Sequence, residues 1–532
     1  MSDEAREHVE VFDTTLRDGT QLEGVSVTVD DKLRIAEQLD HLGVTYIEGG
    51  WPGANPKDIE FFQRARSELH LDTSGLVAFG STRRVKGKVD DDATLRNLVE
   101  AGTSTVCIVA KAWDYHVVEA LQTTLDEGVA MVADSVEFLG GHGLRVLVDA
   151  EHFFDGYKRN PEFSLRVLEA AVQQGATHLV LCDTNGGSLP FEVESIVGDV
   201  VRHLGSDATI GIHCHDDTGC AVANTMAAVR AGARHVQGTI NGLGERTGNA
   251  NLSTIIPNLT LKMGFATLPE GRLERLTSVS HHIAELVNMP LNPQAPYVGS
   301  SAFAHKAGLH VSAIVRAKDA YEHVDPEHVG NGTRFVVSEL AGKSTIKLKA
   351  DELGIPMDGA AVNAVIDELK RLEHEGYHFE AADASLELLL RKATGWSQSY
   401  FSVESMRVIT DELPNGQFTT EATVKVHVPQ GDGTDERIVR TAEGNGPVNA
   451  IDAALRSAIA ARYPELDRVH LTDYKVRILD TAAGTGAVVR VLIDATDGER
   501  TWSTIGVSEN IIQASWQALS DSMVFGLLAA RG

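Results

Sequence analysis

Residues 209–215, TIGIHCH, combine a short apolar run with two histidines at its end. The apolar part suits a parallel β-strand that is buried on both faces, and the polar end suits the loop after such a strand. The same arrangement recurs at intervals of roughly 30 residues from residue 8 to about residue 241, each time before a longer amphipathic stretch. We expect eight strands, at residues 9–13, 44–48, 75–79, 105–110, 144–149, 178–183, 209–215 and 235–241.

Eight β/α units predict a (β/α)8 TIM barrel of the α/β class, which we place at residues 1–265. A doubly wound open sheet is the alternative, since periodicity alone does not show that the sheet closes. The rhythm then changes. Helical patterns interrupted by a segment rich in Gly, His and Pro predict helical subdomains at residues 266–398, and residues 399–532 are mostly strand-like.

The C-terminal region contains an internal repeat. Residues 436–441 (ERIVRT) and 499–504 (ERTWST) resemble each other at a spacing of about 63 residues. Each stretch follows two patterns of alternating strands and precedes a helical pattern. We therefore expect a C-terminal α+β domain of two β-β-β-α units, separate from the barrel.

Charge and composition exclude several classes of function. The chain has 47 Lys and Arg against 75 Asp and Glu, a formal net charge of −28, which would repel nucleic acid and anionic membranes. No apolar run reaches the ~18 residues of a membrane-spanning helix, and the acidic start is unlike a signal peptide. The four cysteines form no C-x-x-C pair, which fits a reducing compartment. We expect a cytoplasmic protein with no nucleic-acid or membrane partner.

The reactive groups of a (β/α)8 barrel lie at the C-terminal ends of its strands. His213 and His215 are two residues apart on one strand, so both imidazoles face the same side and can bind one ion. Asp18 follows the first strand and Asn249 follows the last, and closure brings both ends near the seventh. The four residues predict a site for a divalent metal ion, Mn2+, Mg2+, Zn2+ or Co2+, with positions left open for water or substrate.

Other strand ends also carry polar residues. Arg17 provides a cation beside Asp18, either for a developing oxyanion or for a salt bridge with Glu48 that orders the barrel mouth. Glu151 is a candidate base or substrate-positioning carboxylate, with a solvated surface position as the alternative. Thr184 can donate a hydrogen bond to a substrate carboxylate or cap a helix.

Three stretches resemble the family of 2-isopropylmalate, homocitrate and citramalate synthases: residues 13–21 (DTTLRDGTQ), 213–219 (HCHDDTG) and 241–249 (NGLGERTGN). The resemblance covers essentially the whole chain, because that family joins a catalytic barrel to helical subdomains and, in feedback-regulated members, to a regulatory domain of two β-β-β-α units. It implies an acyltransferase that condenses acetyl-CoA with a 2-oxo acid in a Claisen-type reaction and then hydrolyses the thioester.

The resemblance also implies roles for individual residues. The family places a His and Tyr pair from the helical subdomain over the barrel mouth, and residues 304–310 (AHKAGLH) and 320–323 (AYEH) match those stretches. The general base stays open between Glu151 and this pair. The expected catalytic residues are Arg17, Glu151, His310 and Tyr321; the expected substrate-binding residues are Arg17, Gln21, Glu48, Thr184 and Glu245; the expected metal ligands are Asp18, His213, His215 and Asn249.

Residues 47–58 (IEGGWPGANPKD) resemble the citramalate synthase branch of the family, whose oxo acid is pyruvate. We therefore expect an (R)-citramalate synthase activity in isoleucine biosynthesis, with 2-isopropylmalate synthesis from 2-oxoisovalerate, for leucine, as the alternative. The family also implies a homodimer, because the partner chain supplies the helical subdomain, and isoleucine as effector at the C-terminal domain. A related acyl-CoA lyase and an amino-acid sensor that keeps the barrel only as a scaffold are further alternatives.

Overall fold

The computed structural model describes residues 6–305, 313–314, 316–317, 321–335, 343–396, 399–430, 432–479 and 481–531. The chain divides into two compact units. The first consists of Met1–Phe303 and His323–Thr333, and the second consists of Ala304–Glu322 and Arg334–Gly532.

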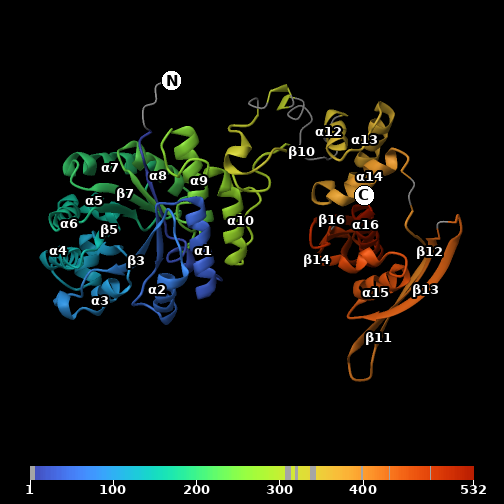
Figure 1. Ribbon diagram of the computed structural model, residues 1–532, viewed down its shortest axis with the longest axis horizontal. Helices are drawn as coiled ribbons and strands as arrows, with labels where there is room; N and C mark the ends of the chain where they lie inside the picture. Colours follow the sequence, from blue (N-terminus) through green and yellow to red (C-terminus); the bar gives the residue numbers. More distant parts are fainter. Residues whose placement is uncertain are drawn as a thin grey trace. The chain divides into compact units, whose positions relative to one another are not determined.

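The first unit is built on a closed barrel of eight parallel strands in sequential order (Figure 1). Pairing of the first strand with the eighth, with Glu10 opposite His235, closes the sheet and excludes the open-sheet alternative. The predicted (β/α)8 barrel is confirmed. Its strands are β1 (Glu10–Asp13), β2 (Tyr46–Gly50), β3 (Gly75–Ser81), β4 (Thr105–Lys111), β5 (Arg145–Glu151), β6 (His178–Asp183), β7 (Thr209–Cys214) and β8 (His235–Gly238).

The eighth strand is three residues shorter at its end than predicted. It ends at Gly238, because Asn241 adopts a left-handed φ of 63° that no strand accommodates. The residues that follow therefore form a loop, and this loop brings Asn249 back to the end of β7 through a bridge with His215.

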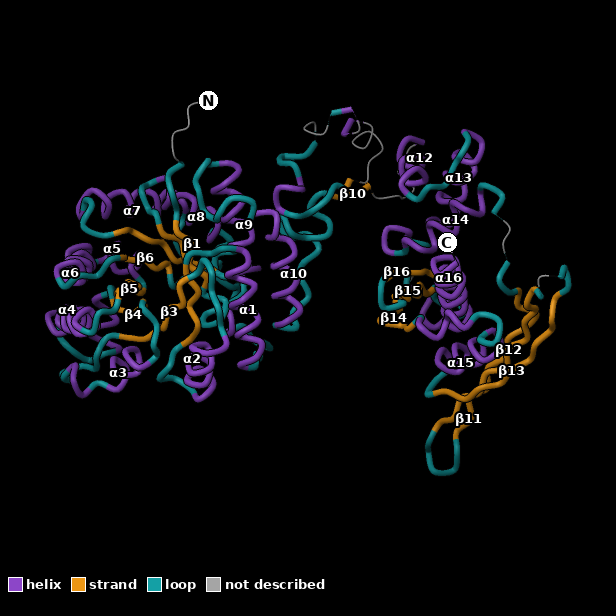
Figure 2. Tube along the Cα trace, in the orientation of Figure 1, coloured by secondary structure: helices purple, strands orange, loops and turns teal. Residues whose placement is uncertain are grey.

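Helices surround the barrel, as the ring of helices around the central strands in Figure 2 shows. Several begin at side chains that accept a hydrogen bond from the first turn, such as Thr28, Asn55 and Asp92. Their inner faces pack on the outward apolar residues of the strands to form one continuous core. They are α1 (Val29–Leu42), α2 (Pro56–Glu68), α3 (Ala93–Glu100), α4 (Leu125–Gly141), α5 (Phe153–Arg159), α6 (Pro161–Gln173), α7 (Pro190–Leu204), α8 (Ala221–Arg230), α9 (Leu252–Pro257) and α10 (Leu276–Leu286).

The second unit begins with a two-stranded sheet and a small helical region. The helical region packs around an apolar core that includes Val365, Leu369 and Leu386 and extends to Ile505 and Val507 of the second repeat. The strands of the small sheet are β9 (Ala304–His305) and β10 (Arg334–Phe335). The helices are α12 (Lys343–Glu352), α13 (Gly359–His374) and α14 (Asp383–Ala393).

Two β-β-β-α repeats complete the second unit and confirm the predicted C-terminal domain. In the central strand of the first repeat, Ala422, Val424, Val426 and Val428 are fully buried and the residues between them are not, so one face of the sheet is covered. The repeats are β11 (Ser402–Glu412), β12 (Phe418–Pro429), β13 (Asp435–Gly444) with α15 (Pro447–Ile459), and β14 (His470–Ile478), β15 (Val489–Thr496), β16 (Thr501–Ser508) with α16 (Ile511–Arg531).

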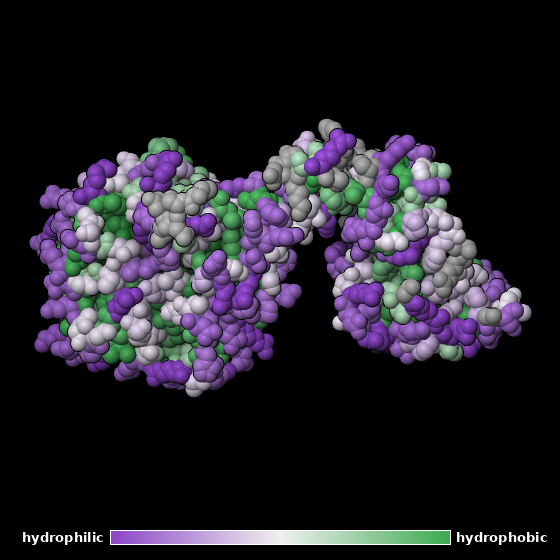
Figure 3. Space-filling view, turned by 45° about the horizontal axis from the view of Figure 1, so that its top comes forward, coloured by the Kyte–Doolittle hydropathy of each residue, from purple (hydrophilic) through white to green (hydrophobic). Residues whose placement is uncertain are grey.

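Polar side chains cover much of the face shown in Figure 3, in keeping with the formal net charge of −28. Among the described residues, no helix combines the length and the apolar character needed to span a bilayer.

Candidate active site and metal centre

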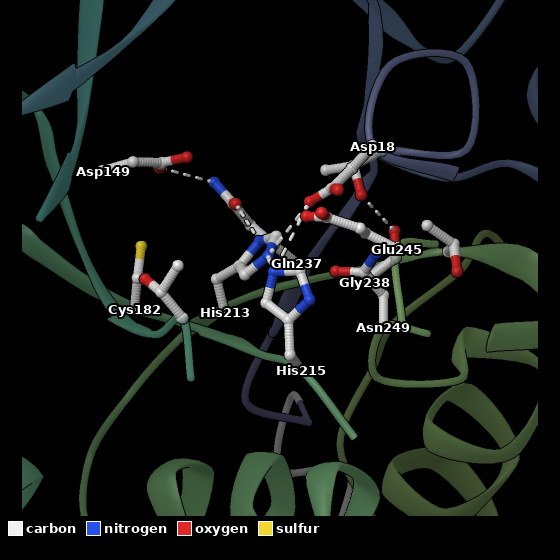
Figure 4. A network of polar contacts seen from close by, with 12 residues as sticks. Asp18, Asp149, Cys182, His213, His215, Gln237, Gly238, Glu245 and Asn249 are labelled. Carbon is white, nitrogen blue, oxygen red and sulfur yellow. Dashed lines mark hydrogen bonds and ion pairs between the residues drawn. The ribbon is translucent and has the colours of Figure 1, made fainter. Parts of the chain in front are cut away.

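Asp18, His213 and His215 converge at the C-terminal end of the barrel (Figure 4). The Asp18 carboxylate oxygen Oδ2 lies 3.3 Å from Nε2 of His213 and 3.8 Å from Nε2 of His215. The two Nε2 atoms are 3.4 Å apart. All three side chains are buried. These spacings approach the ~3.4 Å edge of a tetrahedron with ~2.1 Å ligand bonds.

A short polar chain fixes the orientation of His213. Gln237, in β8, donates from Nε2 to Oδ1 of Asp149, in β5, at 3.0 Å. Its carbonyl Oε1 lies 2.9 Å from Nδ1 of His213 and therefore accepts a hydrogen bond from that nitrogen. In the neutral imidazole, Nε2 then carries the lone pair that faces Asp18, which is the state needed to bind a metal. Neither Gln237 nor Asp149 was predicted as a functional residue from the sequence.

Asn249 supplies an oxygen beside this group. Its Nδ2 donates to the carbonyl of Leu243 at 3.1 Å, whereas its Oδ1 is buried and has no hydrogen-bond partner among the described residues. Figure 4 shows its side chain next to those of Asp18 and His215. The loop needs a glycine at position 244, where φ is 152° and a Cβ would lie 2.2 Å from Asn249 Nδ2.

These residues fit a divalent ion. Burying an unpaired amide oxygen costs free energy unless a ligand satisfies it. Imidazole lone pairs that face a buried carboxylate carry a similar cost. A mixed set of two nitrogens and two oxygens suits the divalent first-row metals. The predicted ligands Asp18, His213, His215 and Asn249 thus lie together.

Arg17 is held rigidly next to the group. Its Nε lies 2.6 Å from Oε2 of Glu48, its Nη1 lies 3.3 Å from Oδ2 of Asp18, and its guanidinium stacks 3.9 Å from the ring centroid of Phe79. The salt bridge to Glu48 considered from the sequence is therefore present. It leaves Arg17 as a fixed cation beside Asp18.

The charges of these residues are tightly coupled. Burial alone would raise the pKa of Asp18, but Arg17 and the imidazole of His213 hold that pKa well below its usual range. Burial raises the pKa of Glu48 to about 7, although Arg17 opposes the shift. Burial, together with the neighbouring His213, lowers the pKa of His215 to about 4, so His215 is neutral near pH 7.

A cavity of about 530 Å³ opens beside Arg17. Its lining places Gln21 near Arg17 and adds two further cations, Lys32 and Lys57, from α1 and α2. Asp58 also lines the cavity and forms an ion pair with Lys32, so the positive charge of this recess is partly neutralised.

The remaining predicted residues lie at other strand ends. Glu151 ends β5 and forms an ion pair with Lys111 of β4. Thr184 follows β6, and its Oγ1 accepts a hydrogen bond from the backbone N–H of His152 at 2.9 Å, which leaves the hydroxyl proton available. Glu245 lies on the exposed loop after β8.

The structure describes only one of the two residues expected from the helical subdomain. His310 lies outside the described residues. Tyr321 belongs to the second unit, where its side chain is exposed. Their roles stay predictions.

Family models match the chain in three parts. The HMGL-like family matches residues 8–283, a domain described as homocitrate synthase post-HMGL domain-like matches residues 297–377, and the LeuA allosteric (dimerisation) domain matches residues 380–526.

Three relatives match over almost their full length. The (R)-citramalate synthase of Streptomyces coelicolor is 55% identical, covering 98% of this chain and 97% of that protein. The (R)-citramalate synthase of Aquifex aeolicus is 52% identical and covers 98% of each chain. A probable 2-isopropylmalate synthase of Methanopyrus kandleri is 33% identical, covering 96% of this chain and 97% of that one. With its closed barrel, two β-β-β-α repeats and these full-length matches, the chain belongs to the (R)-citramalate synthase family of HMGL-like proteins.

Proposed function

We propose that this chain is an (R)-citramalate synthase, which condenses acetyl-CoA with pyruvate. The proposal rests on the identity of 55% to an (R)-citramalate synthase across 98% of the chain. The grouping of Asp18, His213 and His215 at the barrel mouth supports it, because a protein that kept the barrel only as a scaffold has no need of that group. The 2-isopropylmalate alternative has weaker support, from an identity of 33%.

The proposed reaction needs no oxidant or reductant. The methyl carbon of acetyl-CoA loses a proton and forms a bond to the ketone carbon of pyruvate, whose oxygen gains a proton. Water then cleaves the thioester, so that CoA leaves as a thiol and citramalate remains.

The residues of the barrel mouth fit the first step. A divalent ion held by Asp18, His213, His215 and Asn249 supplies a Lewis acid for the ketone when it is bound. Arg17 adds a positive charge that already lies in place, so no side chain has to reorganise as the ketone oxygen becomes negative.

Substrate contacts are assigned to the residues around this centre. The free hydroxyl proton of Thr184 suits the carboxylate of the oxo acid. Gln21 lines the cavity beside Arg17, and Glu48 acts through the guanidinium it holds. Glu245, on the exposed loop beside the site, is assigned to the outer part of a substrate.

The acetyl methyl group is a weak acid and needs a positioned base. Glu151 is one candidate, since a carboxylate at a strand end can reach a substrate in the barrel mouth while Lys111 holds it in place. The other candidate is the pair of His310 and Tyr321.

We assign regulation by isoleucine and a homodimeric state to the second unit. The match to a LeuA allosteric (dimerisation) domain supports regulation and dimerisation, and isoleucine as the effector follows from the proposed place in isoleucine biosynthesis. Apolar side chains on its strands are exposed, including Val439, Val476 and Ile478, and a second copy can cover them. The four cysteines are free, which supports the cytoplasm as the compartment.

Release of CoA with a panel of oxo acids tests the proposal. The full-length chain with Mn2+ or Mg2+ is given acetyl-CoA and pyruvate, 2-oxobutyrate, 2-oxoisovalerate or 2-oxoglutarate, and free thiol is measured. We expect the highest kcat/KM with pyruvate and inhibition by isoleucine rather than leucine. Faster turnover of 2-oxoisovalerate together with inhibition by leucine would replace the proposal with 2-isopropylmalate synthesis.

A further inference from the structure

A second group of metal-binding side chains lies at the opposite end of the barrel. Glu10, His178 and His235 are the first residues of β1, β6 and β8, so they lie at the N-terminal end of the strands. Oε2 of Glu10 is 2.7 Å from Nε2 of His178 and 3.2 Å from Nδ1 of His235. Two imidazoles and one carboxylate thus meet here, as they do at the other end.

The group is enclosed but reachable. The His235 side chain is fully buried and that of His178 is 7% exposed, whereas the Glu10 side chain is 25% exposed. The rings of Phe12 and Tyr46 lie 5.3 and 6.1 Å from the His235 ring and restrict its position. Of the three side chains, that of Glu10 is therefore the most accessible to solvent.

The contact between Glu10 and His178 is short enough that a proton or a metal ion must lie between the two atoms. The Thr177 hydroxyl lies 3.3 Å from the carbonyl of Val146 and 2.9 Å from Nδ1 of His178, so it can donate to either atom. Where it donates to Val146, Nδ1 of His178 carries the ring hydrogen. In a neutral imidazole the Nε2 lone pair then faces the Glu10 carboxylate at 2.7 Å. Such a contact is repulsive unless a proton or a metal ion lies between the two atoms.

We infer that Glu10, His178 and His235 form a second site for a divalent transition metal such as Zn2+ or Co2+. Two nitrogens and one oxygen suit these ions, whereas Mg2+ prefers an all-oxygen set. The donor atoms need to separate by less than about 1 Å to reach the ~3.4 Å spacing of tetrahedral ligands. The solvent side next to Glu10 leaves a fourth position for water.

The role of this site is structural. It joins β1 to β8, the pair that closes the barrel, and joins both to β6. Residues at the N-terminal face of a (β/α)8 barrel contribute to stability rather than to catalysis. The ion therefore stabilises the closed sheet, and the rate of turnover does not depend on it.

Reciprocal double variants of the full-length chain test the inference. One variant carries Glu10→Gln and His235→Gln, the other carries Asp18→Asn and His215→Gln. Each protein is dialysed against Zn2+, and bound zinc is counted per chain by mass spectrometry. We expect two equivalents in the parent and one in each variant, with CoA release lost only in the Asp18 variant.

Exposed histidines provide the control for adventitious zinc. His427 forms an exposed pair with Glu404 at 3.3 Å, so His427→Gln should leave the count at two. A parent with a single equivalent, or a Glu10 variant that still binds two, would overturn the inference.

A second measurement covers the case in which the Glu10 variant does not fold. In the Asp18 variant, the group of Glu10, His178 and His235 is intact. It should bind one equivalent of Co2+ with the visible absorption of a four-coordinate ion. Zn2+ should also raise the thermal midpoint of this variant, because an ion that binds only the folded chain stabilises it. No bound ion and no shift of the midpoint would likewise overturn the inference.

Discussion

Gln237 accepts a hydrogen bond from Nδ1 of His213 at 2.9 Å, and this contact decides which nitrogen of the imidazole faces Asp18. The orientation depends in turn on Asp149, which accepts from the amide of Gln237. We expect Gln237→Met to weaken binding of the divalent ion by about 10- to 100-fold, the usual effect of removing a partner behind a histidine ligand. Titration against a metal chelator measures this affinity. An unchanged affinity would show that the ring is held by other contacts.

Arg17 presents its guanidinium to two carboxylates at once, Glu48 and Asp18. A lysine ammonium is a point charge and cannot maintain both contacts. Arg17→Lys is therefore expected to lower kcat by about 100-fold or more, as loss of a preorganised oxyanion donor does. Steady-state CoA release measures this change in kcat. Arg34→Lys, at an exposed position on α1, is the matched control and should leave kcat unchanged.

Gly244 allows the loop to approach Asn249. A Cβ at this position would lie 2.2 Å from Asn249 Nδ2, so Gly244→Ala should displace the amide and weaken both metal binding and CoA release. Gly24→Ala separates this effect from backbone strain, because Gly24 also has a positive φ, 85°, but open space around its Cβ position. If the two variants lost metal affinity equally, the close approach to Asn249 would not be the cause.

Asp13 gives the barrel a measurable pH dependence. Burial raises its pKa to about 7, although hydrogen bonds from Thr15 oppose the shift. Because the folded state favours the protonated form, the stabilisation is complete below the unfolded pKa of ~4 and is lost as the pH rises to about 7. The slope is at most about 1.4 kcal/mol per pH unit.

Thermal midpoints between pH 5 and 8 test this expectation. The midpoint of the parent chain should fall more steeply with rising pH than that of Asp13→Asn, which carries no titrating group at this position. Parallel pH profiles for the two proteins would contradict the raised pKa of Asp13.

Two variants distinguish the candidate bases. Glu151→Gln removes the carboxylate that pairs with Lys111, and Tyr321→Phe removes one hydroxyl of the alternative pair. The variant that lacks the base should lose about 100- to 10,000-fold in the rate at which acetyl-CoA exchanges methyl hydrogen with deuterated solvent. NMR measures the exchange. Loss of this exchange in Glu151→Gln alone would identify Glu151 as the base.

The barrel and the C-terminal repeat could be predicted because both depend on local periodicity. The predicted and observed bounds of β6, residues 178–183, are identical. The end of β8 could not be predicted in this way, since Asn241 turns the chain through a left-handed conformation that hydrophobicity does not encode.

The candidate metal ligands could also be anticipated, because His213 and His215 stand out at the end of an apolar strand. The groups behind them could not. Gln237 and Asp149 are 88 positions apart and meet only inside the closed barrel. The cluster of Glu10 with His178 and His235 was missed for the same reason, as its members lie 168 and 225 positions apart.

Closure of β1 on β8 joins residues that are 224 positions apart, such as Thr14 and Gly238. Contacts of such long range form late in folding, because the entropy of closing the intervening chain must be overcome first. During synthesis, the ribosome releases β1 long before β8 exists. A nascent chain consequently lacks the complete set of candidate ligands until the residues after its last barrel strand emerge, so an ion can bind all four only once the barrel is finished.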